Sequence, residues 1–290
     1  MRTIKKIHKA VYAPMDDLVT YRALPTREVE YIDPFLFLNH HGPQVYKPGN
    51  RGLPFGPHPH RGFETLTFIL DGDIMHQDTG GGKDVIEAGG VQWMTAGSGL
   101  IHAEVSSDKF KKEGGPLEIL QLWFNLPSKL KMAKPTYIGL QKEAIPVVTE
   151  DDGKVKVNVI SGNWGATKGP IPSLSDIHMA SIEIQAGGSF ATTIASDRNI
   201  FFYVVRGAVI VNGQKVDKLN LVEFTNDGEE LKVEALENSY ILLGHALPFN
   251  EPVVSHGPFV MNTEEMVRVF LSTAFEGGRH QNRVNKIADC

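Results

Sequence analysis

The sequence predicts an all-β fold, because short apolar segments alternate with turn residues along the whole chain. The 290 residues include 29 glycines and 17 prolines, which separate runs rich in β-branched and aromatic side chains. Runs of this kind, bounded by Gly, Pro, Asp or Asn, are typical of strands joined by tight turns. Helical periodicity over longer stretches is scarce, so we expect helices to contribute little.

Nine segments carry the strand pattern, and they fall in both halves of the chain. They are Glu64–Leu70, Val91–Thr95, Glu118–Asn125, Val155–Ile160, His178–Ile184, Ile200–Val205, Ala208–Val211, Leu231–Ala235 and Tyr240–Leu243. A helix is expected at Thr263–Ser272, where Asn262 or Thr263 can cap the start and two glutamates follow in the first turn. A weaker helical pattern runs from Arg279 to the C-terminus.

A weak internal repeat points to two similar domains. Leu66–Gly72 reads LTFILDG and Phe201–Gly207 reads FFYVVRG, and the two segments lie about half the chain length apart. Each is an aromatic-containing strand closed by a glycine turn. We therefore predict two β-domains, 1–134 and 150–290, with a linker near Lys134–Asp152. Two such patterns can also arise by chance, and the repeat alone does not separate these alternatives.

The charge balance argues against a nucleic-acid-binding protein. Lys and Arg total 29 and Asp and Glu total 34, which gives a net charge of −5 with neutral histidines. Binding to a phosphate backbone needs a basic face. The sequence does contain a modest basic cluster, for which we favour a solvated surface over a nucleic-acid patch. It comprises Lys109, Lys111, Lys112, Lys129, Lys131 and Lys134.

The cysteine count and the apolar runs bear on the compartment. The single cysteine, Cys290, excludes an intrachain disulfide and a thiolate metal cluster within one chain. The opening residues, MRTIKKIHKAVYAP, lack the continuous apolar core of a signal peptide. No run approaches the roughly 20 apolar residues of a membrane helix. We therefore expect a soluble cytoplasmic protein without a membrane partner.

Two short motifs carry the residues of a metal site. Gly52–Glu64 reads GLPFGPHPHRGFE and Gly97–Glu104 reads GSGLIHAE. Residues i and i+2 of a strand share a face, so His58 pairs with His60, and His102 pairs with Glu104. Two such pairs on neighbouring strands can enclose one cation. Three imidazoles and a carboxylate suit Fe, Mn, Co, Ni, Cu or Zn, and a six-coordinate ion would keep two positions open.

Other polar residues leave alternatives open. Glu64 shares the even strand phase of the histidines, so periodicity does not distinguish it from Glu104 as the carboxylate ligand. A structural hydrogen bond or a pair with Arg61 would also explain Glu64. His76 and Asp78 share one phase and could reach a pocket, although we favour a surface hairpin end.

The second half of the chain is predicted to bind no metal. Counting back from Gly207 by the spacing between His58 and Gly72 leads to Thr193, and the next position of the pair is Ala195. Neither residue can replace an imidazole ligand. The remaining histidines of this half, such as His245 and His256, are interpreted as structural or surface groups.

These motifs resemble a known family. Gly52, His58, His60 and Glu64 match the first cupin motif, although Gly72 follows one residue later than the general pattern. Several further blocks, spread over both halves, are similar to the pirin form of the cupin. They are Pro57–Thr65, Gln92–Gly97, His102–Glu104, Asp33–Leu36 and His256–Thr263.

The pirin resemblance implies a fold and a ligand set. It implies two stacked, jelly-roll-like cupin β-barrels with a short C-terminal helix. It implies one divalent metal in the N-terminal barrel, most often Fe(II), held by His58, His60, His102 and Glu104. The C-terminal barrel is then metal-free, and Glu64 is expected to have a supporting or pocket role.

The resemblance also implies an activity. It is quercetin 2,3-dioxygenase activity, with a small phenolic flavonol and dioxygen as substrates. Glu104 or Glu64 would accept the proton of the flavonol 3-hydroxyl as general base. The alternative is a non-catalytic, iron-dependent redox sensor that binds a transcription factor or a metabolic enzyme. Oxygen consumption with substrate distinguishes the two.

Overall fold

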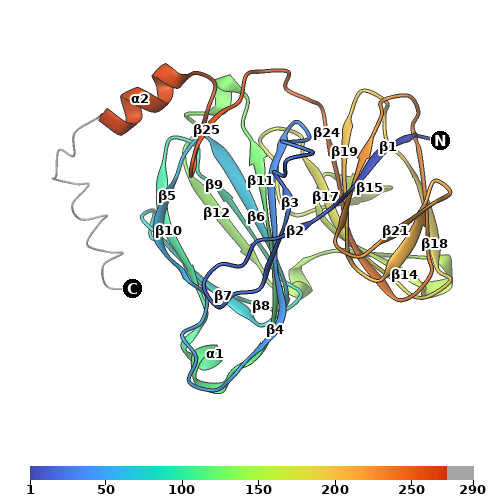
Figure 1. The fold of residues 1–290 in the computed structure, drawn as a ribbon, viewed down its shortest axis with the longest axis horizontal. Helices are drawn as coiled ribbons and strands as arrows, with labels where there is room; N and C mark the ends of the chain where they lie inside the picture. Colours follow the sequence, from blue (N-terminus) through green and yellow to red (C-terminus); the bar gives the residue numbers. More distant parts are fainter. Residues whose placement is uncertain (273–290) are drawn as a thin grey trace. The chain divides into compact units, whose positions relative to one another are not determined.

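The computed structural model describes residues 1–272 and confirms the all-β prediction (Figure 1). Each of the nine predicted strands is present, and Val91–Thr95, His178–Ile184 and Ala208–Val211 have the predicted bounds as β9, β17 and β20. Two α-helices occur in this range, α1 (Asp108–Glu113) and α2 (Glu264–Ser272). None of its helices is long and apolar enough to cross a membrane.

The predicted C-terminal helix is confirmed as α2. It begins one residue later than expected, and the backbone N–H of Met266 donates to the Thr263 side chain at 3.2 Å. Thr263 therefore caps the helix, as its position in the sequence predicted. The weaker helical pattern from Arg279 lies outside the described residues.

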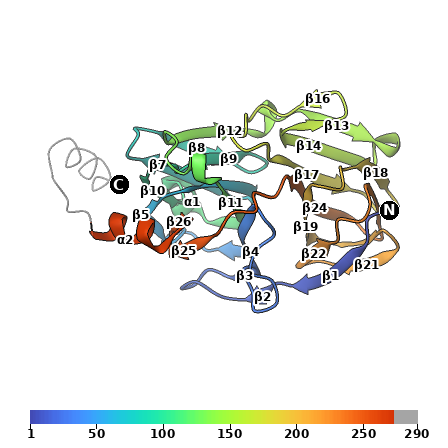
Figure 2. The same ribbon diagram turned by 90° about the horizontal axis from the view of Figure 1, so that it is seen from above.

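The chain divides into two compact units, which we call the first and second barrel. Among the described residues, the first barrel comprises 14–20, 41–142 and 250–272, and the second comprises 1–13, 21–40 and 143–249. The change at 142–143 lies inside the predicted linker. The two ends of the chain belong to the opposite barrels from those predicted. At the N-terminal end, β1 (Ile4–Lys9) pairs with β22 (Asn220–Phe224) in the second barrel (Figure 2). Local patterns carry no information about such a distant partner.

Two antiparallel sheets form the framework of the first barrel. In this unit, one sheet has the order β12 (Thr136–Leu140), β9, β6 (Phe63–Asp71), β11 (Gly115–Asn125) and the second half of β4 (Phe35–Tyr46). β3 (Thr20–Leu24) and β2 (Val11–Tyr12) come next in the sheet order, and nearly all of their residues are assigned to the second barrel. The other has the order β5 (Phe55–His60), β10 (Leu100–Val105), β7 (Asp73–Asp78), β8 (Lys83–Glu87). Buried aliphatic residues such as Ile69, Ile74 and Ile119 pack together in its core. The hairpin of β25 (Val254–His256) and β26 (Phe259–Met261) follows in the same unit.

The second barrel repeats this architecture. Its larger sheet has the order β1, β22, β19 (Asn199–Arg206), β24 (Ser239–Ala246), β17, β14 (Val155–Ser161), β13 (Val147–Glu150). Its smaller sheet has the order β18 (Ser189–Thr193), β23 (Glu230–Ala235), β20, β21 (Gln214–Asp217). A short hairpin, β15 (Asn163–Trp164) with β16 (Thr167–Lys168), follows β14. The apolar core of this barrel consists almost entirely of aliphatic side chains and phenylalanines.

The predicted sequence repeat corresponds to equivalent strands. β6 and β19 each end at a glycine with positive φ, 86° at Gly72 and 81° at Gly207. A side chain at Gly207 would also lie within 2.3 Å of the Ser239 hydroxyl. Both turns therefore require glycine, and both lead into the smaller sheet of their own barrel.

Candidate metal centre

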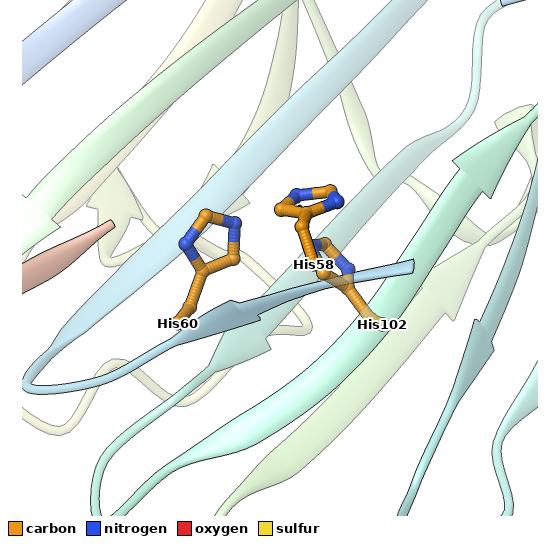
Figure 3. A group of neighbouring side chains, drawn as sticks. All are labelled: His58, His60 and His102. Atoms are coloured by element: carbon orange, nitrogen blue, oxygen red, sulfur yellow. The ribbon is translucent and has the colours of Figure 1, made fainter. Parts of the chain in front are cut away.

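Strands β5 and β10 bring three histidines together. The two strands pair antiparallel with His58 opposite His102, and His60 follows two residues later on β5. The Nε2 atoms of His58 and His102 are 3.0 Å apart, and one nitrogen from each of the three rings lies within 4.8 Å of the others. Figure 3 shows the three imidazoles converging from the two strands. This is the cluster that the two motifs predicted.

Some of the ring nitrogens in the cluster have hydrogen-bond partners and others have none. His58 Nδ1 donates to the Gly56 carbonyl at 2.7 Å, so the neutral ring carries its proton there and presents a lone pair at Nε2. Both ring nitrogens of His60, and Nδ1 of His102, are buried without a hydrogen bond of normal geometry. Buried polar atoms without partners are costly. A cation among the rings would satisfy the facing nitrogens, so the donor set fits a divalent metal.

Burial keeps the rings in the ligand form. Burial, reinforced by the neighbouring His58, lowers the pKa of His60 to about 3. Burial also holds the pKa of His102 well below its ordinary value, and the nearby imidazoles act in the same direction. Both rings are therefore neutral near pH 7, which is the protonation state that binds metals.

The metal-free protein should lose stability in mild acid. His60 takes up a proton in the unfolded chain below pH 6.5 but in the folded chain only near pH 3, so stability falls as pH falls between these values. Each such histidine contributes up to about 1.4 kcal/mol per pH unit. With His102 acting alike, we expect a loss of roughly 2–3 kcal/mol between pH 7 and 5.5. Urea unfolding of chelator-treated protein at several pH values measures this loss in the free energy of unfolding. His60→Phe should make the free energy of unfolding less dependent on pH, whereas replacement of the exposed His256 by phenylalanine should leave the pH dependence unchanged.

Glu104 lies beside the histidines and is held by three donors. Its Oε2 is 3.8 Å from His102 Nε2 and accepts a hydrogen bond from the Gln121 amide at 2.6 Å. Its Oε1 accepts from the Thr67 hydroxyl at 3.2 Å and from the Gln92 amide. Thr67 stands opposite both glutamines on the neighbouring strands, so the three donors form one row across β9, β6 and β11. Sequence analysis missed this row, although its polar residues interrupt otherwise apolar strands.

Glu64 lies on the opposite face of β6. It is three residues from Thr67 and therefore points away from the row that contacts Glu104. Its Oε1 accepts from Thr95 at 2.6 Å and from Trp93 at 3.1 Å, and burial raises its pKa although these two hydrogen bonds oppose the shift. Counting in even steps from His58 and His60 does not predict the direction of Glu64, because the turn at Gly62, with φ 84°, separates β5 from β6. Glu64 therefore makes structural hydrogen bonds, which is one of the alternatives that the sequence left open for this residue.

The expectation that His76 and Asp78 form a surface hairpin end is wrong. Their exposed fractions are 1% and 4%, and β7 pairs with β10 so that His76 stands opposite Glu104 and Asp78 opposite His102. Cross-strand partners share a face, so both line the same interior. His76 Nε2 lies 2.8 Å from Asp78 Oδ2, and Tyr137 stacks on the His76 ring at 3.8 Å. Tyr137 carried no sequence signal.

The second barrel holds other residues at the equivalent positions. In the first barrel, His76 lies four residues after the turn at Gly72 and pairs with Glu104. In the second barrel, Val211 lies four residues after the turn at Gly207 and pairs with Val233. Two residues earlier than Val233 is Leu231, whose partner on β18 is Thr192. Strand pairing therefore makes Thr192 the counterpart of His58, one residue from the predicted Thr193. None of these side chains in the second barrel is an imidazole or a carboxylate.

Comparisons with known proteins agree with the two-barrel architecture. The pirin domain matches residues 17–124, and the pirin C-terminal cupin domain matches residues 179–279. A pirin-like protein of Caulobacter vibrioides is 40% identical over 246 residues, which is 84% of this chain and 86% of that protein.

Two solved structures extend the comparison. A quercetin 2,3-dioxygenase of Acinetobacter baumannii has a TM-score of 0.88 and 31% identity, covering 93% of this chain and 96% of its own. A bacterial pirin of Escherichia coli in complex with nickel(II) shares the fold, with a TM-score of 0.67 and 23% identity over 84% of this chain and 99% of its own. Because both pirin domains match in order and a relative is 40% identical over most of its length, the chain belongs to the pirin family of two-domain cupins.

Proposed function

We propose that this protein is a metal-dependent dioxygenase that cleaves flavonols, with quercetin 2,3-dioxygenase activity. The observation that carries the proposal is the convergence of three imidazoles and one fixed carboxylate inside the first barrel. The similarity to the quercetin 2,3-dioxygenase of Acinetobacter baumannii, at 31% identity, supports the same activity. The overall reaction adds dioxygen to the flavonol and releases a ring-opened ester and carbon monoxide.

The metal is proposed to be Fe(II), held by His58, His60, His102 and Glu104. Mn, Co, Ni, Cu and Zn suit the same nitrogen and oxygen donors and stay alternatives. A bound divalent cation supplies Lewis acidity that favours the ionised 3-hydroxyl of the substrate, and a redox-active one also permits reaction with dioxygen.

The protein's own residues would position the substrate and accept its proton. The amides of Gln92 and Gln121 fix both oxygens of Glu104, which lies 3.8 Å from His102 Nε2 and is therefore the proposed general base. Trp123 packs against His60 with ring centroids 5.4 Å apart, and its Nε1 donates to Gln121 Oε1 at 3.3 Å. This aromatic wall suits a planar phenolic substrate, because aromatic faces bury flat rings well.

Glutamine substitutions at the two carboxylates should separate their roles. Glu104→Gln removes a ligand charge and turns an amide group toward the donors of Gln92 and Gln121. We expect metal affinity to fall at least about tenfold and turnover at least about 100-fold. Glu64→Gln is the matched control, and it should retain metal and activity because Glu64 faces the other side of β6. Equal losses in both variants would contradict the assignment of Glu104.

Oxygen uptake on quercetin tests the activity itself. The protein is loaded in turn with Fe(II), Mn, Co, Ni and Cu, and oxygen consumption is followed beside a His102→Ala control. The proposal expects at least one metal form to exceed the control clearly. If none does, the flavonol activity is refuted and the regulatory alternative gains support. Undiminished uptake by His102→Ala would place the chemistry outside this site.

A further inference from the structure

The second barrel contains a cavity that the proposed metal chemistry does not use. Its volume is about 120 Å³, and residues of β14, β17, β18 and β24 line it. Val159, Ala180 and Leu243, which belong to the barrel core, form apolar walls. Thr192, the counterpart of His58, also lines it. The second barrel therefore retains an interior space where the first barrel has its histidine cluster.

Two histidines of the larger sheet stand at this cavity. His178 on β17 lies opposite His245 on β24, and their ring centroids are 4.4 Å apart. Both have the same strand phase as the core residues Ala180 and Leu243, so both rings face the barrel interior. His245, for which the sequence predicts a structural or surface role, is hydrogen-bonded to Arg198 and also lines the cavity.

The hydrogen bonds of these histidines determine their tautomers. Arg198 Nε donates to His245 Nδ1 at 2.7 Å, and because arginine is always protonated, the neutral His245 ring carries its hydrogen on Nε2. His178 Nδ1 accepts from the backbone N–H of Asn163, and its Nε2 lies 3.3 Å from Asp176 Oδ1. The two nitrogens of His178 are thus engaged, whereas His245 Nε2 remains as a donor for the cavity.

The donor at His245 is rigid and uncharged. Arg198 is anchored by an ion pair to Asp176 at 2.6 Å and by the His245 carbonyl at 3.3 Å. Burial, together with His178 and Arg198, lowers the pKa of His245 to about 3, so the ring stays neutral near pH 7. A fixed neutral N–H beside apolar walls favours an oxygen acceptor on an otherwise apolar ligand.

The β15–β16 hairpin borders the cavity. Trp164 lines both the inner cavity and an open groove beside it, which also includes Thr193 and Glu230. The Trp164 ring packs edge-on against Phe190 at 5.6 Å, and its Nε1 donates to Glu150 at 2.7 Å. Figure 2 shows β16 beside β14. The indole therefore stands between the interior and the solvent.

We propose that the second barrel binds a monocyclic aromatic ligand whose oxygen accepts a hydrogen bond from His245 Nε2. The cavity volume of about 120 Å³ is close to the roughly 150 Å³ that accepts a single benzene ring, so one aromatic ring fits. The apolar walls and the Trp164 indole would contact the ring. This site is independent of the metal and of the proposed oxygenase activity.

Titration of the full-length protein with phenol and with benzoate tests the proposal. Binding is followed by calorimetry and by the indole N–H resonance of Trp164 in NMR spectra. We expect saturable binding of at least one probe below about 10 mM. Toluene, which has the ring but no hydrogen-bond acceptor, should bind at least about tenfold more weakly. No saturable binding of either probe would overturn the proposal.

Variants locate the site. His245→Phe retains an aromatic ring but removes the donor, and it should weaken binding about tenfold; the exposed His256→Phe is its matched control. Thr192→Phe should fill the cavity from β18 and abolish binding, which keeps the test valid if His245→Phe unfolds. His102→Ala should bind the probes unchanged. Binding lost in His102→Ala but retained in Thr192→Phe would assign it to the first barrel and refute the proposal.

Discussion

Replacing His58 and His60 together by alanine will remove nearly all bound metal. Both residues lie on β5 and face His102 across the strand pair, so the double variant leaves two of four proposed ligands. Loss of a group that merely orients a ligand costs 10–100-fold in metal affinity, so removal of two ligands should cost more than about 100-fold. Elemental analysis of purified protein should fall from about one metal per chain to near zero, and oxygenase activity should be lost with it.

The matched control for this variant is His256→Ala. His256 is exposed on β25, so the His256→Ala protein should retain its full metal content. A double variant that keeps its metal would contradict the ligand assignment. Wild-type protein with two tightly bound metals per chain would contradict the prediction that the second barrel is metal-free.

Replacing Lys131 by methionine will strongly destabilise the first barrel. Our expectation of a solvated lysine was wrong here, because the side chain is completely buried and its Nζ donates to the carbonyls of Gly62 and Val260 at 2.9 Å and to Asn125 Oδ1 at 2.5 Å. Methionine fills similar volume but leaves three buried acceptors without this donor. We expect a loss of about 3–5 kcal/mol in the free energy of unfolding, measured in urea.

The pH dependence of this loss gives a second readout. Burial lowers the pKa of Lys131 to about 7, although Glu251 opposes the shift, whereas the unfolded side chain titrates near 10.5. Between these values the unfolded chain holds the extra proton, so wild-type stability from this group rises with pH. The difference from Lys131→Met should therefore grow by roughly 1–2 kcal/mol from pH 7.5 to 9. Exposed Lys129→Met should show neither effect; an equal loss there would refute the argument.

Sequence alone predicted nine of the strands correctly, because each of these is a local pattern of apolar residues ended by a turn. Val91–Thr95 and His178–Ile184 have the predicted bounds, and Thr263 caps its helix as expected. The pairing of β1 with β22 was not predictable, since it joins residues from opposite ends of the chain. Lys131 was also missed, because two of its three acceptors, the carbonyls of Gly62 and Val260, belong to segments distant in sequence.

The candidate site shows the same limit. His58, His60 and His102 were found because i, i+2 spacing places them on shared faces, and the structure brings them together. Periodicity failed for Glu64, since a turn resets the phase between β5 and β6, and it failed for His76, which reaches the site only through the pairing of β7 with β10. Strand register, which the sequence does not display, decides which polar side chains meet.

The most direct test of the metal centre is anomalous diffraction from crystals of the iron-loaded protein. One strong peak is predicted in the first barrel, with nitrogens of His58, His60 and His102 and an oxygen of Glu104 at about 2.0–2.2 Å. A peak bonded to a Glu64 oxygen with Glu104 turned away would contradict the proposed ligand set. A peak between His178 and His245, with none among the three histidines of β5 and β10, would contradict the location of the site.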